Sequence, residues 1–325
     1  MNKNHKNTII YLAAMVVALL LGACSDDMFE EGGQQHSNDR IQLSGDIDQL
    51  AVTRVNDNGF CNGDVMGVYI VDYDGGTPGT LKVSGNRGDN VRHTFDEPNY
   101  RWNSAYDLYW KDKHTHIDVY GYYPFADPES VDNYQFEVKR DQSKPSENGE
   151  MGGYEASDFL WGKVADVAPT TSVIRLPMKH RMANARVTLV EGSGFAAGEW
   201  AGTEKTVLAP NLIRKASINL ADGTVTANGS VEATATMPSR SGNEWRAIVV
   251  PQTVKAGETL FSITIGGVPY KFAKNEAFTY MPGKMSNFSI RVDKKAGSGQ
   301  YQLTLISESI TPWENDLVSH NATAK

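Results

Sequence analysis

Apolar and polar residues alternate with a period of two through most of the chain after about residue 41. Because successive side chains of a β-strand point to opposite faces, this pattern predicts strands with one buried face. Residues 134–138 are an example, since Tyr134, Phe136 and Val138 fall on one face with polar residues between them. Segments of roughly five to eight residues end at Gly, Asn, Asp or Pro, which are typical of turns.

A helical pattern is missing from the same part of the sequence. After residue 24, no stretch keeps the apolar spacing of a helix over three turns, and the nearest candidate, residues 195–205, contains glycines that disfavour a helix. Residues 215–227 contain two alternating segments around Asp-Gly, which is typical of a β-hairpin. We therefore expect an all-β body, either one β-sandwich or two in tandem, with Pro177 marking an edge or a kink in residues 172–190.

The length of 325 residues fits about two domains of average size. The best candidate boundary is the glycine-rich and apolar-poor segment 191–211. No internal repeat is strong enough to place the boundary more closely. We therefore predict an N-terminal β-sandwich domain over residues 41–195 and a C-terminal one over residues 196–325.

The first residues form a targeting segment. Lys3 and Lys6 precede an apolar run over residues 9–21, which is too short for a membrane span of about 20 residues but suits a signal peptide. The run ends in Leu-Gly-Ala before Cys24, and this pattern resembles the lipobox of bacterial lipoproteins, in which the cysteine carries acyl chains. Residues 1–23 are then a lipoprotein signal peptide. The alternative is an ordinary signal peptide followed by an incidental cysteine.

Several acyl chains on Cys24 would anchor the protein stably to a membrane, here the outer membrane. Acidic residues follow at positions 26–27 and 30–31, and they resemble the surface-export signal of Bacteroidetes lipoproteins. They equally suit a solvated tether, because residues 24–40 contain few apolar side chains and are typical of a flexible linker. We expect the mature protein to be exposed at the cell surface.

The acidic balance of the chain argues against nucleic acid as a partner. The formal net charge is −8 at pH 7, whereas binding to a phosphate backbone needs a basic face. The two cysteines, Cys24 and Cys61, have no spacing typical of zinc sites, and a disulfide between them requires Cys24 to stay in the folded domain. No basic residue or histidine adjoins Cys61 in sequence, so we interpret it as a small buried or half-buried residue.

Few residues have the signature of a chemical site. His114 and His116 share a face of a strand and could bind a metal, but a solvated strand start is the favoured interpretation because no third ligand accompanies them. Asp72 and Asp74 lack the full spacing of a calcium loop and indicate a turn. No motif of a hydrolase or of a phosphate-binding loop is present. The sequence therefore predicts no catalytic residue, no metal ligand and no cofactor.

A group of aromatic residues leaves two interpretations open. Trp102, Tyr106, Tyr109 and Trp110 lie close together in the sequence. Exposed rings could form a platform that stacks sugars, with Trp102, Tyr109 and Trp110 as its members, whereas aromatic residues at the start of strands usually fill a core. The core is the favoured interpretation, and a surface protein that binds glycans is the alternative.

Several short motifs follow one another along the chain. They are the lipobox, Val52-Thr53-Arg54, residues 64–69 (DVMGVY), 120–124 (YGYYP), 158–162 (DFLWG), 176–187 (LPMKHRMANARV) and 310–313 (ITPW). Taken in this order, they resemble the fimbrillin family, the subunits of type V pili in Bacteroidales. The likeness covers nearly the whole mature chain; each piece is weak alone, but the ordered set is fairly specific. One departure is Pro177-Met178, where many relatives have a more uniformly apolar strand.

The resemblance implies two tandem transthyretin-like β-sandwiches and no enzyme activity. It also implies export as a lipoprotein precursor and cleavage by an arginine-specific protease between Arg54 and Val55. The cleavage would release the lipid and remove the first strand, roughly residues 41–52, which leaves a groove with unpaired backbone groups. An extended segment of another subunit would fill this groove by strand addition. Because such head-to-tail contacts do not close on themselves, they build a filament.

The candidate donor is the C-terminal stretch, in which Tyr301, Leu303 and Leu305 alternate and Ile310 and Trp313 follow. The expected partners are other pilin subunits, the protease, the outer membrane before processing, and a host glycan or protein. If the chain stays uncut, the protein would keep its lipid and act as a pilus anchor or as a surface lipoprotein that binds glycans. A hydrolase is the third alternative, because carboxylates far apart in sequence can meet in space.

Overall fold

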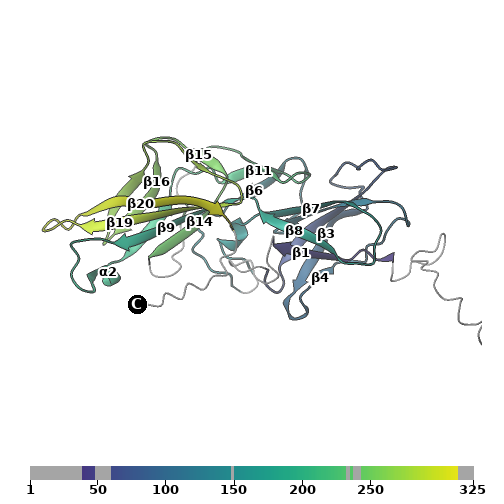
Figure 1. The fold of residues 1–325 in the computed structure, drawn as a ribbon, viewed down its shortest axis with the longest axis horizontal. Helices are drawn as coiled ribbons and strands as arrows, with labels where there is room; N and C mark the ends of the chain where they lie inside the picture. Colours follow the sequence, from purple (N-terminus) through teal and green to yellow (C-terminus); the bar gives the residue numbers. More distant parts are fainter. Residues whose placement is uncertain (1–38, 48–59, 148–149, 232–234, 237–242, 314–325) are drawn as a thin grey trace, which may run out of the picture.

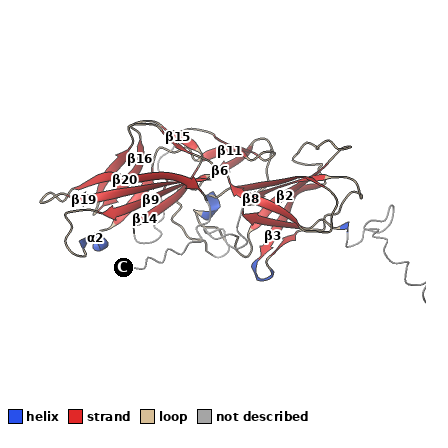
Figure 2. Cartoon of the chain, in the orientation of Figure 1, coloured by secondary structure: helices blue, strands red, loops and turns tan. Residues whose placement is uncertain are grey.

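The computed structural model describes residues 39–47, 60–147, 150–231, 235–236 and 243–313. Strands dominate these residues, and Figure 2 shows them at both ends of the molecule. The prediction of an all-β body is confirmed, and the weak helical candidate at 195–205 contains only one short turn. Within the described ranges, no helix combines the length and the apolar character needed to cross a bilayer. The helical elements named within the described ranges are η2 (Glu97–Asn99), η3 (Glu155–Ser157) and α2 (Glu199–Gly202).

Seven strands form one curved sheet in the first half of the chain. Neighbouring strands are antiparallel, except that β1 and β8 are parallel. The two edge strands, β1 and β4, lie close to each other. The indole Nε1 of Trp102 in β4 donates a hydrogen bond to the carbonyl of Gly45 in β1 at 3.0 Å. The sheet therefore wraps around its own core. In spatial order the strands are β1 (Leu43–Ile47), β8 (Ile174–His180), β7 (Leu160–Val167), β5 (Ile117–Tyr123), β2 (Val65–Asp72), β3 (Gly88–Asp96) and β4 (Arg101–Ser104).

Two four-stranded sheets share a second core in the other half of the chain. Their neighbouring strands are antiparallel, except that β9 and β19 are parallel. One sheet has the order β14 (Glu244–Val249), β9 (Ala183–Glu191), β19 (Lys284–Lys294) and β20 (Tyr301–Pro312). The other has the order β13 (Ala235–Thr236), β10 (Lys205–Ala209), β16 (Thr259–Ile265) and β17 (Val268–Ala273), and a separate pair consists of β15 (Gln252–Val254) and β18 (Phe278–Tyr280).

A small three-stranded sheet joins the two halves, which lie end to end along the long axis in Figure 1. It pairs β6 (Tyr134–Glu137) of the first half with β11 (Lys215–Asn219), which in turn pairs with β12 (Thr224–Ala227). A third buried cluster, the junction core, lies here and draws side chains from both halves. The buried amide of Gln142 also makes two hydrogen bonds to the backbone of Ile248, at 2.7 and 2.8 Å. The halves are thus held together by strand pairing, packing and buried hydrogen bonds.

The hydrogen bonding changes from the first group of sheets to the second earlier than the sequence suggested. β9 pairs with β14 and β19, whereas the predicted N-terminal domain extends to residue 195. If the two halves are divided by which strands pair with each other, the division falls between the end of β8 at His180 and the start of β9 at Ala183. Composition does not mark this point, because the apolar alternation runs on through it. The glycine-rich segment 191–211 is instead a connection inside the second half, from β9 to β10.

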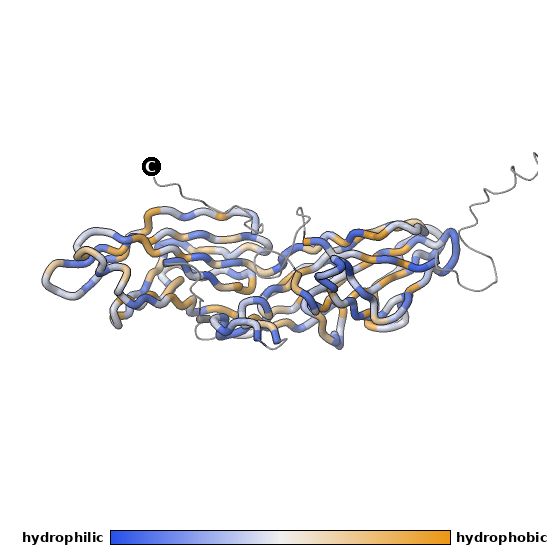
Figure 3. Tube along the Cα trace, turned by 90° about the horizontal axis from the view of Figure 1, so that it is seen from below, coloured by the Kyte–Doolittle hydropathy of each residue, from blue (hydrophilic) through white to orange (hydrophobic). Residues whose placement is uncertain are grey.

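Three local predictions can be followed in the structure. Tyr134, Phe136 and Val138 are buried together, as their alternation predicted, and Figure 3 shows such alternation along many strands. Residues 215–227 form the expected hairpin, with Asn219 paired to Thr224 across the turn. Pro177, however, lies inside β8, which stands between β1 and β7 and is not an edge strand while β1 is in place.

Candidate functional site: the first and last strands

The first described segment, residues 39–47, ends in β1 (Leu43–Ile47) and lies against the core of the first half. Ile41 and Leu43 are 5% and 7% exposed, and Ile47 packs against the same cluster. Leu43 and Ile47 lie on the inner face of β1, and Ile41 lies just before the strand. Because burial of one such side chain is worth roughly 1.5–3 kcal/mol, this segment contributes strongly to the stability of the first half.

The backbone of this segment is bonded on two sides. On one side β1 runs parallel to β8, with Leu43 opposite Ile174, and the N–H of Ile174 donates to the carbonyl of Gln42 at 2.9 Å. On the other side the N–H of Ile41 donates to Leu108 at 2.8 Å, and the N–H of Trp110 donates to Asp39 at 2.9 Å. Removal of residues 39–47 would therefore leave unpaired backbone groups on both flanks of a groove.

Gly45 is the small residue of the inner face. A Cβ atom at this position would lie 3.0 Å from the sulfur of Met66 and 3.5 Å from the ring of Trp102. Both side chains are buried and fill the space that a larger residue would need. The groove is thus deep at positions 41 and 43 and shallow at position 45.

The chain re-enters the described part at Phe60, which is buried beside the groove. Its ring lies edge-on to Trp102 at 4.8 Å and to Tyr123 at 5.5 Å. Next to it, burial raises the pKa of the Asp64 carboxyl above its ordinary value, although hydrogen bonds from Cys61 N–H and the Tyr123 hydroxyl oppose this rise. Phe60 would therefore keep the following chain in the core even if residues 39–47 were absent.

Three residues of the predicted assembly mechanism lie outside the described residues. They are the lipidation candidate Cys24 and the two residues of the cleavage candidate, Arg54 and Val55. Their roles stay predictions from the sequence. What the described residues add is that the predicted cleavage point falls between the buried β1 and the buried Phe60.

The last strand, β20, lies at the edge of its sheet. Among the described strands it pairs with β19 alone. Tyr301 and Leu303 are half-buried and pack against the core of the second half. Further along the strand, Leu305, Ile306 and Ile310 are 37%, 52% and 41% exposed. β20 therefore offers an extended backbone edge and apolar side chains that its own half does not cover.

Two contacts fasten the C-terminal part of β20. The carboxylate of Glu308 accepts hydrogen bonds from the ammonium of Lys274 at 2.7 and 2.8 Å. Burial alone would lower the pKa of Lys274, but the hydrogen bonds with Glu308 and Glu276 outweigh it, and the pKa is raised. Trp313, directly after the strand, is 7% exposed and belongs to the junction core.

The aromatic group near residue 105 is divided between core and surface. Trp102 and Trp110 are buried in the core of the first half, and the indole of Trp110 donates to the carbonyl of Thr170 at 3.1 Å. Tyr106 is exposed and Tyr109 is half-buried. The platform of Trp102, Tyr109 and Trp110 is therefore wrong, because two of its three rings have no free face, and the favoured core interpretation is confirmed for both tryptophans.

The candidate metal ligands His114 and His116 have protein partners in the structure. His116 pairs with Asp166 at 2.7 Å, whereas the backbone N–H of His114 binds Asp112. Asp74 pairs with Thr77 in a turn, as expected. Across the described ranges no group of three or more His, Cys, Asp or Glu is arranged to hold a metal ion. Cys61 is half-buried, in agreement with its interpretation as a small packing residue.

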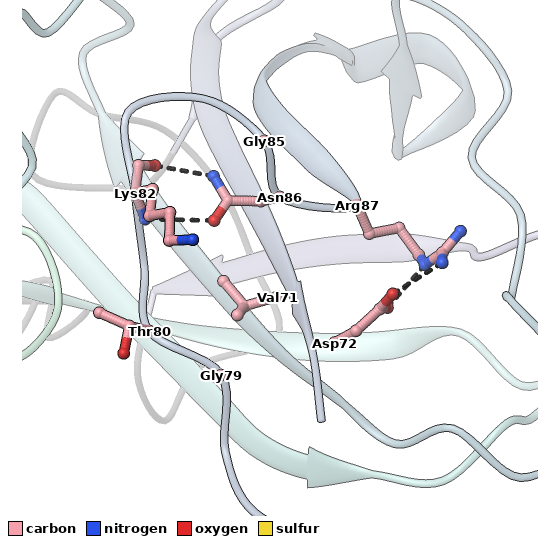
Figure 4. A pocket seen from close by; sticks show the side chains of 8 residues that line it. All are labelled: Val71, Asp72, Gly79, Thr80, Lys82, Gly85, Asn86 and Arg87. Carbon is pink, nitrogen blue, oxygen red and sulfur yellow. Dashed lines mark hydrogen bonds and ion pairs between the residues drawn. The ribbon is translucent and has the colours of Figure 1, made fainter. Parts of the chain in front are cut away.

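A polar hollow of about 420 Å³ lies beside the end of β2 (Figure 4). Its polar side chains are largely engaged with the protein itself. Arg87 binds both carboxylate oxygens of Asp72, at 2.6 and 2.7 Å. Asn86 binds the backbone N–H and carbonyl of Lys82. These contacts join Lys82 to Asn86 within the loop and Arg87 to the end of β2.

A family model described as fimbrillin-like matches residues 53–313 of the chain. Two solved structures are similar over most of both chains. One is a candidate cell adhesion protein of Bacteroides uniformis, with a TM-score of 0.59, 17% identity, and coverage of 86% of this chain and 100% of that one. The other is a candidate cell adhesion protein of Bacteroides ovatus, with a TM-score of 0.60, 14% identity, and coverage of 84% and 97%. A search of curated proteins finds no match.

Proposed function

The chain belongs to the fimbrillin-like family, and from this premise we propose that it is a structural pilus subunit that polymerises by strand exchange and serves cell adhesion. Family membership supports the coarser statement, a fimbrial protein at the cell surface. The proposed mechanism rests on one observation above all: residues 39–47, which include β1, form an extended segment that is bonded on both flanks and has buried apolar side chains, just ahead of the cleavage candidate.

We propose that an arginine-specific protease cuts between Arg54 and Val55 and that the strand before the cut then leaves. Its loss opens the groove described above and makes β8 an edge strand. Pro177 in the middle of β8 suits such an edge, because proline cannot donate a backbone hydrogen bond. Phe60, packed on Trp102, keeps the new N-terminal segment attached beside the groove.

The groove sets a size pattern for the strand that replaces β1. Its inner positions are filled in order by two large side chains and a glycine, Ile41, Leu43 and Gly45. A replacement strand must offer large, large and small residues at alternate positions, because Met66 and Trp102 occupy the space over the third. A mismatch would force packed side chains off their preferred rotamers.

We propose β20 of a second copy as this replacement. One set of its alternating residues has the required order, namely Leu303, Leu305 and Ser307. The other set, starting at Thr304, brings Glu308 to the place of the glycine, where its charge would lose water. Leu303 and Leu305 would then take the deep positions and Ser307 the shallow one, while main-chain hydrogen bonds form on both sides.

Before the cut, we propose that acyl chains on Cys24 hold the precursor at the outer membrane, with residues 24–40 as a tether. The cut would detach the folded part from this anchor. The same event thus frees the subunit and opens its groove. A subunit that escapes cleavage would stay lipidated and serve as an anchor, which is the alternative to a polymerising pilin. The two transthyretin-like domains implied by the family resemblance are part of this proposal.

The proposal is tested by treating the purified mature protein with an arginine-specific protease and separating the products on unheated SDS gels. We expect a ladder of polymers for the wild type and for Arg40→Ala, a matched control that leaves Arg54 in place. Arg54→Ala should give no ladder. Intact mass should show a new N-terminus at Val55. A protein cut at this bond that stays monomeric would overturn strand exchange, and surface protein that still carries lipid on Cys24 would favour the anchor.

A further inference from the structure

Trp313 is an anchor point at the end of an otherwise exposed strand. Its ring stacks on the imidazole of His180, with centroids 4.0 Å apart and planes at 11°. Its backbone N–H donates to the carbonyl of Gly283 at 3.0 Å. The ring is one of the members of the junction core, together with Met182 and Met285. Trp313, directly after β20, is therefore fixed where the two halves of the molecule meet.

The other side of this contact belongs to the first half. His180 is the last residue of β8, and its Nδ1 lies 2.9 Å from the carboxylate of Asp158. Both side chains are almost fully buried, so the orientation of the imidazole is fixed. A Cβ at Gly283 would lie 3.0 Å from the carbonyl of His180, which shows how closely the second half approaches here. The Trp313 ring thus enters a rigid slot.

A buried nitrogen of His180 makes the closed slot less favourable. Among the described residues, the Nε2 atom of His180 has no hydrogen-bond partner. While Trp313 covers the imidazole, this nitrogen is also cut off from water, and a buried polar atom without a partner is costly. Withdrawal of the ring would let water reach Nε2. Stacking and apolar burial therefore favour the closed slot, and the unsatisfied nitrogen lowers the cost of opening it.

The position of Trp313 decides which end of β20 can separate first. At its N-terminal end β20 is joined to β19 by the short connection over residues 295–300, so that end cannot move far. The pairing must therefore open from the C-terminal end, where Trp313 is held. Between these ends β20 has a register shift near Ile306 and few buried side chains.

We propose that Trp313, His180 and Asp158 form a C-terminal latch, and that withdrawal of Trp313 from its slot controls how often β20 separates from β19. The latch joins the last strand of the second half to the end of β8 in the first. It exists in the single, uncut chain. Only its consequence rests on the proposed function: if β20 is the donor, the latch keeps it in its own sheet until the slot opens.

Hydrogen exchange followed by mass spectrometry tests the latch in the full mature chain carrying Arg54→Ala, which removes the cleavage candidate. In Trp313→Ala, peptides from residues 301–313 should exchange about 10-fold faster than without this substitution, because the opening equilibrium of a local unit shifts. For Trp313→Phe, which keeps a ring in the slot, the exchange rate over residues 301–313 should lie between these two rates. Ile310→Ala is the matched control, since it removes apolar surface from β20 itself but leaves the slot filled, and it should change exchange less than about 3-fold.

Equal exchange over residues 301–313 in Trp313→Ala and Ile310→Ala would overturn the latch. A uniform acceleration that also includes β1 and β16 would overturn it as well, because Trp313 would then support the whole fold. If Trp313→Ala does not fold, Trp313→Phe takes its place: exchange over residues 301–313 that is no faster than in Ile310→Ala would overturn the latch. Failure of the cut protein to polymerise would count against the proposed function alone, because exchange is measured on the uncut monomer.

Discussion

β1 and β20 are the two strands on which the proposed assembly depends, and they are held in opposite ways. β1 has five residues, belongs to a segment bonded on two sides, and buries its inner face. β20 has twelve residues, pairs with β19 alone among the described strands, and leaves most of its side chains exposed. The shorter strand is thus the better integrated one.

This difference fits the proposed order of events. A strand bonded on two flanks leaves only when the chain is cut and its place can be filled, so its removal can be controlled by a protease. A strand bonded on one flank can separate by itself once the contact at its end opens. We expect substitutions in β1 to cost more stability than matched substitutions in β20, and four experiments test this expectation.

The largest effect is expected for Leu43→Ala in β1, compared with Leu305→Ala in β20. Loss of a buried leucine leaves a cavity, so Leu43→Ala should lower the free energy of unfolding by about 2–5 kcal/mol. Leu305 is partly exposed, and its truncation should cost less than about 1 kcal/mol. Urea denaturation of both variants measures the difference. A larger loss for Leu305→Ala would reverse the comparison.

The next effect concerns the shallow position of the groove. Gly45→Val should cost about 1–3 kcal/mol, because its methyl groups press on Met66 and Trp102. The matched change in the other strand, Ser307→Val, places the same side chain on an exposed position and should stay within about 0.5 kcal/mol. Thermal unfolding of the two variants compares them. An unchanged stability of Gly45→Val would mean that the groove is deeper than its neighbours suggest.

A smaller effect is expected for Glu308→Gln, which weakens the ion pair that fastens β20. The pair with Lys274 is largely shielded, and we expect a loss of about 0.5–1 kcal/mol at neutral pH. Because the pKa of Lys274 is raised in the folded protein, this contribution is fully present below the ordinary value of 10.5 and is lost as the pH rises through the folded pKa. The stabilities of wild type and variant should therefore converge in strong base. A constant difference up to that pH would assign the loss to another cause.

The smallest effect is expected for Ile306→Ser, at the register shift of β20. This side chain is 52% exposed, so the stability should change by less than about 0.5 kcal/mol. Light scattering at high concentration should show less association of the uncut protein, because an apolar residue on an open strand edge favours it. A loss of stability comparable to that of Leu43→Ala would mean that β20 is covered by contacts beyond its pairing with β19.

Much of this contrast follows from local sequence patterns. The alternation at 41, 43 and 47 predicts the buried face of β1, and the hairpin at 215–227 follows from Asp-Gly between two alternating segments. Partners far along the chain could not be predicted in this way. The bonds between residues 39–41 and 108–110 join segments about 70 residues apart, and no local period identifies such a neighbour. The contacts of His180 could not be predicted either, because they are made with Asp158 and Trp313, which lie far from it in the sequence.

Local sequence patterns specify the secondary structure class, the two terminal strands that assembly is proposed to use, and the motifs that resemble fimbrillins, because each depends on residues within one short segment. Which strands pair follows only from the folded arrangement, and this pairing places β9 in the second half. The folded arrangement also decides that Trp102 and Trp110 are core residues and that Trp313 closes a slot on His180. These outcomes depend on packing between distant segments, where a ring is buried or exposed according to the neighbour that arrives and not according to its own place in the pattern.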